Sequence, residues 1–198
     1  IVVVTSPASG IKTMKELQVL ARGKPNQVPY ASSGQGSIQH LLGEQFSRAM
    51  GIDLLHVPYK GGGQAVNDVI AGQVTVAVLG AASVMPHIKS GRLIALAVST
   101  RARSPMLPDT PTLAESGAGE LDVPQWSALF AMEGTPPAVL ARLRRSVEET
   151  LAEPALKQRF AGASMDIVAT PPEAFQKRML QDRERLGKII KDRQISLD

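Results

Sequence analysis

The strongest constraint on the fold is an alternation of short apolar runs with amphipathic segments over the first hundred residues. Apolar runs such as Ile1–Val4 and Val74–Leu79 have the length and composition of buried strands. Between such runs, segments such as residues 38–50 place apolar residues on one helical face and end at a glycine. Strands that alternate with short helices predict a parallel or mixed sheet with helices on both faces. We therefore expect an open α/β lobe over residues 1 to about 100.

The pattern changes in the second half of the chain. Residues 101–111 are a proline-rich loop, and most of the remaining residues are predicted to be helical. Strands are predicted only at residues 126–132 and 166–168. One or two strands with two or three helices do not make a complete lobe. We therefore expect these later elements to be the returning half of a lobe whose first half is missing.

Two helix starts carry the Thr-x-x-Glu pattern of a capping box, in which each side chain hydrogen-bonds the backbone of the other residue. The first pattern begins at Thr13, and its helix is expected to stop near Gly23. The second begins at Thr112 and is followed closely by Gly117. We expect a helix after each threonine.

Composition and charge exclude several classes of protein. The chain has no cysteine, which excludes disulfide scaffolds and cysteine-based zinc or iron–sulfur sites. Its net charge is +4, but from Arg142 onward most basic residues alternate with acids, as on solvated helix faces, so we expect no nucleic-acid partner. No apolar run reaches the ~18 residues that a membrane span needs. No motif suggests a metal, and we expect no cofactor.

The candidate binding site is a loop rich in serine and glycine that follows a short predicted strand and precedes the helix at Ile38. Ligands of open α/β sheets bind beyond the carboxyl ends of strands, where helix N-termini offer unpaired N–H groups and a partial positive charge. Glycines allow close approach of the backbone, and serines add hydroxyl donors. The loop therefore suits a carboxylate or a similar anion. The residues proposed to bind the ligand here are Ser32, Ser33, Gly34, Gly36 and Ser37.

A plainer interpretation of this loop stays open from the residues alone. Ser37 would be an ordinary N-cap, and the glycines would only form a turn. Gly34 and Gly36 lack the third glycine of a dinucleotide-binding pattern, so a nucleotide site is a poor match. A similar loop, residues 59–63, precedes another predicted helix and is either a flexible turn or a second wall of the same cleft. This second loop lacks the Gly-Lys-Ser/Thr ending of a phosphate loop.

The sequence does not predict an enzyme. Packing or capping is the favoured role for His40 and His56, and His87 is expected to be exposed. Ser33 and His40 imitate a nucleophile and its base, but the Gly-x-Ser-x-Gly elbow of such sites is absent. We expect the single tryptophan, Trp126, to pack in a core or at a hinge.

In its motifs and their order, the chain resembles the Bug-type receptors of tripartite tricarboxylate transporters. The resemblance extends from residue 1 to the C-terminus. The matching segments are Tyr30–Leu41, His56–Gly61, Gly72–Val74, Pro86–Leu93, Leu96–Val98, Leu107–Thr112 and Gly134–Pro136. Each motif is weak alone, whereas all of them in this order are specific.

The resemblance implies a periplasmic-binding-protein-like fold of type II, an α/β architecture with two lobes and mixed sheets flanked by helices. Residues 1–122 would be the second lobe, and residues 123–198 would be the returning C-terminal part of the first lobe, whose N-terminal part is missing. Such receptors act in the periplasm, close on a small organic carboxylate without reacting with it, and deliver it to the membrane permease subunits of the transporter. In this family Gly80 and Ala81 would line the same cleft as the serine loop.

Two departures from the family pattern have consequences. Without the missing part of the first lobe, the chain would expose sheet edges and self-associate. Many relatives have a polar pair such as Asp-Asn where this chain has Leu79-Gly80, so the expected ligand is a plain carboxylic acid and not an amino acid. The main alternative is the effector-binding domain of a LysR-type transcription regulator, which shares the two-lobed architecture.

Overall fold

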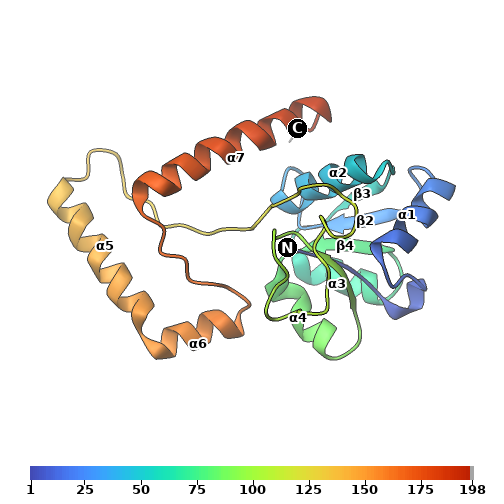
Figure 1. Ribbon diagram of the computed structural model, residues 1–198, viewed down its shortest axis with the longest axis horizontal. Coiled ribbons are helices and arrows are strands. Elements are labelled where there is room, and N and C mark those ends of the chain that lie inside the picture. Colours follow the sequence, from blue (N-terminus) through green and yellow to red (C-terminus); the bar gives the residue numbers. More distant parts are fainter. Residues whose placement is uncertain (197–198) are drawn as a thin grey trace. The chain divides into compact units, whose positions relative to one another are not determined.

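The structure of the chain, a computed structural model, describes residues 1–196 (Figure 1). The chain divides into two compact units by its internal contacts. Unit 1 consists of residues 1–125 together with the described residues from Arg183 onward, and unit 2 is Trp126–Asp182. All the strands of the described residues lie in unit 1.

Unit 1 is built on one five-stranded sheet with the order β3-β2-β4-β1-β5. The strands are β1 (Val2–Thr5), β2 (Pro29–Ser32), β3 (Leu55–Pro58), β4 (Val76–Leu79) and β5 (Ile94–Val98). Strands β2, β3 and β4 are parallel, whereas β1 is antiparallel to both of its neighbours, β4 and β5. The mixed α/β architecture expected from the sequence is therefore confirmed, and the carboxyl ends of β2, β3 and β4 lie at one edge of the sheet.

Helices cover both faces of this sheet, as Figure 1 shows. They are α1 (Met14–Gly23), α2 (Ile38–Met50), α3 (Gly62–Ile70) and α4 (Ala81–Lys89), and a short 3-10 turn, η1 (Pro7–Ser9), follows β1. Successive side chains of a strand point to opposite faces. Val3 accordingly packs in the core under α1 and α2, while Val2 and Val4 pack in the core under α3 and α4. Burial on both faces explains why β1 and β4 are continuously apolar.

The two capping boxes have different outcomes. At Thr13 both reciprocal bonds form, with 3.1 Å from the Glu16 amide to the threonine hydroxyl, and α1 follows as expected. At Thr112 both bonds also form, at 2.7 and 3.1 Å to and from Glu115, but the chain makes only a turn there. Gly117 takes a φ of +89° and ends this turn before a helix can propagate. The helix expected after Thr112 is therefore wrong.

A glycine in the middle of α2 is explained by packing. Glycine within a helix costs about 1 kcal/mol relative to alanine. A Cβ at Gly43 would lie 2.7 Å from Cζ and 2.9 Å from the hydroxyl oxygen of Tyr30, whose ring is fully buried against the helix. The ring therefore requires a residue without a side chain at this position.

The chain enters the sheet of unit 1 and leaves it at neighbouring points. The Ile1 carbonyl accepts a hydrogen bond from the Ser99 amide at 3.0 Å, and the Ser99 carbonyl accepts one from the Val123 amide at 2.9 Å. The Ser99 hydroxyl also donates to the Val123 carbonyl at 2.7 Å. The start of β1 and the segment at Val123 are thus joined through a single residue after β5.

Unit 2 is helical and holds almost no core. It contains α5 (Pro137–Ala152), α6 (Pro154–Gly162) and the first part of α7 (Pro172–Asp192). The strands expected at residues 126–132 and 166–168 are not formed. A strand is stabilised by hydrogen bonds to a neighbouring strand, and residues 126–182 contain none. No helix within residues 1–196 combines the length and the apolar character needed to cross a membrane.

Candidate functional site

Three loops meet at the carboxyl edge of the sheet in unit 1. The first, residues 33–37, follows β2, the second follows β3, and the third is Gly80 after β4. Because β2 lies between β3 and β4, the first loop is the central one. The parallel register pairs Ala31 with Ala77, which places Ser33 level with the end of β4. The serine loop therefore lies level with the end of β4, next to Gly80 and Ala81.

Glycines allow these loops to approach one another closely. A Cβ at Gly34 would lie 3.4 Å from the carbonyl oxygen of Tyr59 in the second loop. A Cβ at Gly62 would lie 2.6 Å from the hydroxyl of Ser83 in the first turn of α4. The Tyr59 amide also donates to the Ser32 carbonyl at 3.1 Å. The second loop is thus a neighbour of the serine loop and of α4, in the position of a second wall.

Helices α2, α3 and α4 all have their N-termini at this edge. Ser37 caps α2, and its hydroxyl accepts the amide of His40 at 3.2 Å. Gly61 and Gly80, the first residues before α3 and α4, provide no side-chain cap. Helix N-termini carry unpaired N–H groups and a partial positive charge, so this edge offers several donors to an anion without a lysine or an arginine.

The serines of the central loop have different roles. Ser32 is fully buried, and its hydroxyl lies 2.7 Å from Nε2 of His56 and accepts the Gly34 amide at 3.2 Å. The hydroxyl of Ser37 donates to the Gly34 carbonyl at 2.7 Å. Ser33 is half-buried, and its hydroxyl has no hydrogen-bond partner within residues 1–196. Ser32 and Ser37 therefore shape the loop, while the Ser33 hydroxyl takes no part in these loop hydrogen bonds.

The backbone of this loop depends on its glycines. Gly34 has a φ of +141° and Gly36 a φ of +70°, values that residues with a side chain rarely adopt. The Gly36 amide donates to Nδ1 of His40 at 3.1 Å. The N-cap interpretation and the anion-site interpretation of Ser37 are compatible, because capping fixes the start of α2 at the edge where the loop lies.

Beneath the loop, two histidines stack on each other. The rings of His40 in α2 and His56 in β3 have centroids 3.7 Å apart and an interplanar angle of 4°. Burial lowers the pKa of His56 to about 4, and the neighbouring His40 adds to this effect. Burial also lowers the pKa of His40, against an opposing influence of Glu44. Both rings are therefore neutral at pH 7.

Ser33 and His40, which imitate a nucleophile and its base in the sequence, are not joined by a hydrogen bond within residues 1–196. Nδ1 of His40 accepts the Gly36 amide and is not directed to Ser33. The close Ser32–His56 contact is inside the core, where Ser32 is 0% exposed and unreachable for a substrate. His87 is half-buried and contacts Arg92 at 2.7 Å, away from both. Within residues 1–196, no group of histidine, aspartate and glutamate side chains is placed to hold a metal ion.

Sequence reasoning missed a pair of glutamines at this edge. Nε2 of Gln39 in the first turn of α2 donates to Oε1 of Gln125 at 3.1 Å. The same oxygen would lie 3.0 Å from a Cβ at Gly80. Gln39 is only 6% exposed, although glutamine is rarely buried. Its place in the helix turn next to the serine loop was a usable signal, whereas Gln125, 86 residues away, gave none.

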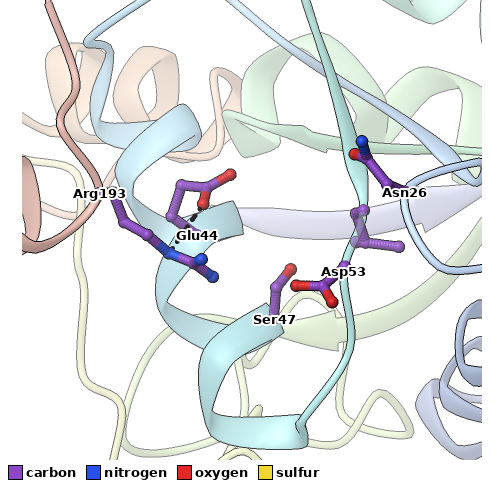
Figure 2. A pocket seen from close by; sticks show the side chains of 6 residues that line it. Asn26, Glu44, Ser47, Asp53 and Arg193 are labelled. Carbon is purple, nitrogen blue, oxygen red and sulfur yellow. Dashed lines mark ion pairs between the residues drawn. The ribbon is translucent and has the colours of Figure 1, made fainter.

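A separate cavity lies at the opposite edge of the sheet (Figure 2). It has a volume of about 420 Å³, and the residues that line it are Asn26, Glu44, Ser47, Asp53, Leu54 and Arg193. Asn26 and Asp53 come directly before β2 and β3, so the cavity lies toward the amino ends of these strands. None of the predicted ligand-binding residues lines it. It is therefore a different feature from the three-loop edge.

Comparison with known proteins identifies the relatives of this chain. A family model described as "Tripartite tricarboxylate transporter family receptor" matches residues 1–195. Protein BugT of Bordetella pertussis (strain Tohama I) is 34% identical over 174 residues, which make up 87% of this chain and 53% of BugT. The chain thus spans about half the length of such curated relatives.

Solved structures give the same picture. A protein described as "Structure of a periplasmic transporter" has 33% identity and a TM-score of 0.88, and the match covers 100% of this chain and 66% of that one. A protein of R. palustris solved with adipate has 25% identity and a TM-score of 0.89, with 98% and 65% covered. The chain therefore has the fold of periplasmic binding proteins over about two thirds of their length.

Proposed function

The chain belongs to the tripartite tricarboxylate transporter receptor family, and from this premise we propose that it captures a small organic carboxylate at the three-loop edge for a membrane transporter. The resemblance inferred from the sequence motifs is thus confirmed. Family membership favours a receptor over the regulatory effector domain. It also favours binding without reaction, since the matched family is one of receptors.

The observation that carries the proposal is the convergence of three helix N-termini around glycine-rich loops. A carboxylate at this edge would accept hydrogen bonds from backbone amides in the first turns of α2 and α4. The free hydroxyl of Ser33 and the amides near Gly80 and Ala81 are the proposed contacts. Hydrogen bonds to a charged acceptor contribute about 1.5–3 kcal/mol each, so a few of them hold a small acid.

The adipate bound by the R. palustris neighbour supports the choice of a carboxylate. Positions 79 and 80 of this chain are Leu and Gly and carry no acidic side chain. The ammonium group of an amino-acid ligand would therefore have no counter-charge there. We therefore propose a plain carboxylic acid as the ligand class and not an amino acid.

The lobes are assigned on the same premise. We propose that residues 1–122 form the second lobe of a longer periplasmic receptor and that residues 123–198 return to its first lobe. The half-length match to BugT supports this assignment. In this proposal the partners are a carboxylate and the permease subunits of the transporter, and the chain taken alone self-associates through uncovered apolar surface.

The site is tested by Gly80→Val, because Gly80 has a φ of −63° and a ψ of 141°, a conformation that valine adopts without strain. Only the flexible end of Gln125 has to move to admit the new side chain. We expect the variant to fold and to bind carboxylates at least about a hundredfold more weakly, the loss of one or two charge-assisted hydrogen bonds. Gly36→Val should also abolish binding, but its positive φ adds strain.

The measurement is calorimetric titration and thermal shift with a panel of mono-, di- and tricarboxylates that includes adipate. Both the 198-residue chain and the longer receptor proposed to contain it are tested. Gly23→Val, at the far end of α1 with nothing within 4 Å of its Cβ, is the matched control and should bind normally. A ligand of the native state raises the melting temperature with concentration. If no acid shifts either form, the chain is not a carboxylate receptor.

A further inference from the structure

The two stacked histidines are joined to the backbone of the serine loop by hydrogen bonds. Nδ1 of His40 is the acceptor for the Gly36 amide, at 3.1 Å. Nε2 of His56 contacts the hydroxyl of Ser32 at 2.7 Å, and the same hydroxyl accepts the Gly34 amide at 3.2 Å. An imidazole nitrogen therefore holds Gly36 directly, whereas Gly34 is held by Ser32, whose hydroxyl also donates to the Gly34 carbonyl at 3.1 Å and lies against His56.

Few charged groups face this pair. On α2, Oε1 of Glu44 lies 4.0 Å from Nε2 of His40. Oε2 of Glu44 is 3.1 Å from Nε of Arg193, in the C-terminal segment of unit 1, and Oε1 accepts the hydroxyl of Tyr30 from β2 at 2.8 Å. Within residues 1–196, the charge that acts on His40 is that of Glu44, and the charge that acts on His56 is that of His40. The Glu44 carboxylate is already engaged by a cation and a hydroxyl.

We propose that His40 and His56 are positioning residues that keep the serine loop in its anion-binding shape only while both rings are neutral, so that acidification releases the bound carboxylate. The release of ligand rests on the proposed function, whereas the coupling between the rings and the loop does not.

The physical reason lies in the geometry of Nδ1. The Gly36 amide needs the lone pair of this nitrogen, and protonation of His40 replaces the lone pair with an N–H that points at another N–H. The stack adds a second penalty, because two cationic rings 3.7 Å apart repel each other. Burial lowers the pKa of both rings, which keeps them neutral until the solution is clearly acidic.

The first arm of the test needs no ligand. Nitrogen-15 NMR of the 198-residue chain follows the amides of Gly34 and Gly36 and the imidazole resonances from pH 7.5 to the lowest pH at which circular dichroism shows the native state. We expect the Gly36 amide to titrate with the midpoint of His40, below the usual value of about 6.5. A Gly36 amide that does not move while His40 titrates overturns the proposal.

Variants separate positioning from simple packing. His40→Asn keeps an acceptor at the place of Nδ1, and His56→Gln keeps an amide group that can donate or accept near the place of Nε2, but neither side chain takes up a proton. We expect the Gly36 amide to become independent of pH in His40→Asn, and the Gly34 amide in His56→Gln. His87→Asn removes the third histidine of the unit, which lies elsewhere, and should leave both titrations unchanged. If either His40→Asn or His56→Gln fails to fold, the titration of the unmodified chain and the other variant still decide.

The second arm uses adipate as the probe, or another acid of the panel that binds. The affinity of the unmodified protein should fall about tenfold more than that of His40→Asn at one pH unit below the His40 midpoint. Protonation of the acid itself is the same for both proteins and cancels. Equal losses, or tighter binding of the unmodified protein at acid pH, overturn the release. If no acid binds but Gly36 follows His40, the ring–loop coupling stands and the proposed function alone fails.

Discussion

Unit 1 and unit 2 both contain amphipathic helices, but their apolar side chains are mostly buried in unit 1 and mostly exposed in unit 2. Every buried apolar side chain of the described residues lies between Val2 and Val123. In unit 2 the only buried residue is Asp182, which accepts the indole N–H of Trp126 at 3.0 Å and pairs with Arg178 at 3.1 Å. The contrast teaches that helix pattern is encoded locally, whereas a core needs the elements on both sides of it.

The relatives explain the second half of this contrast. Helix α5 places Val139, Leu140 and Leu143 on neighbouring turns, yet these side chains are 45%, 42% and 51% exposed. The chain spans about half of BugT, and the lobe assignment proposed above predicts an uncovered apolar face of this kind. Unit 1 buries its own sheet on both faces and needs no such complement.

The largest difference in the free energy of unfolding is expected between two phenylalanine truncations, one in each unit. Phe46→Ala removes a fully buried ring from unit 1 and should lower the free energy of unfolding by about 3–5 kcal/mol. Phe130→Ala removes a ring that is 70% exposed in unit 2 and should change it by less than about 0.5 kcal/mol. Urea denaturation of the monomeric chain, checked at several concentrations for self-association, measures both values.

The same two variants also test the lobe assignment when they are made in the longer receptor. In the longer receptor proposed here, an extra part of the first lobe would cover Phe130, and Phe130→Ala should then become costly, by more than about 2 kcal/mol. An unchanged, negligible cost in the longer receptor would show that unit 2 is not half of a lobe.

A smaller effect is expected from two glycine replacements. Gly43→Ala forces a Cβ against the buried ring of Tyr30 and should destabilise the chain by about 1–3 kcal/mol, although alanine is the better helix former. Gly162→Ala at the end of α6 meets nothing within 4 Å and should be neutral or slightly stabilising. The difference in urea midpoint between the two variants is the measurement, and a stabilising Gly43→Ala would contradict the packing argument.

The smallest effect is the dependence of stability on pH, which should arise in unit 1, where all three histidines lie. The pKa of His56 is lowered from its usual value of 6.5 to about 4, so the unfolded chain binds more protons between these values. The contribution of His56 to stability is complete above about pH 6.5 and falls as the pH approaches 4. We expect a loss of about 1–2 kcal/mol, because the half-exposed ring does not express the full shift.

His56→Gln isolates this effect. The variant should lose less stability than the unmodified chain between pH 6.5 and 4 in urea titrations followed by circular dichroism. The amino group of Ile1, whose pKa burial lowers to about 6, acts in the same direction between pH 8 and 6 and is common to both proteins. A variant with the same acid sensitivity as the unmodified chain would remove His56 as the cause.

The range of each interaction decides how well the sequence predicts it. The Thr13 box and the helix after it depend on residues three apart, and both were predicted correctly. The box at Thr112 is equally local and forms its bonds, but no helix forms after it, because Gly117 ends the turn. The strand at residues 126–132 required a neighbour strand, which the described residues of unit 2 do not supply.

The site divides in the same way. The serine loop was predicted because its strand, glycines and helix start are contiguous in the sequence, and Gly80 came from the family resemblance. The stack of His40 on His56 joins two elements 16 residues apart, and each histidine alone suggested only packing. Gln125 lies 86 residues after Gln39 in the sequence, so no local pattern indicates that it reaches this edge.

The bonds from Ser99 to both Ile1 and Val123 bring the two ends of the segment 1–123 together. A segment whose entry and exit are adjacent can be exchanged between homologous receptors, or circularly permuted with a short linker, without cutting its sheet. Exchange of residues 1–123 as a block between homologous receptors is therefore expected to leave the five-stranded sheet intact.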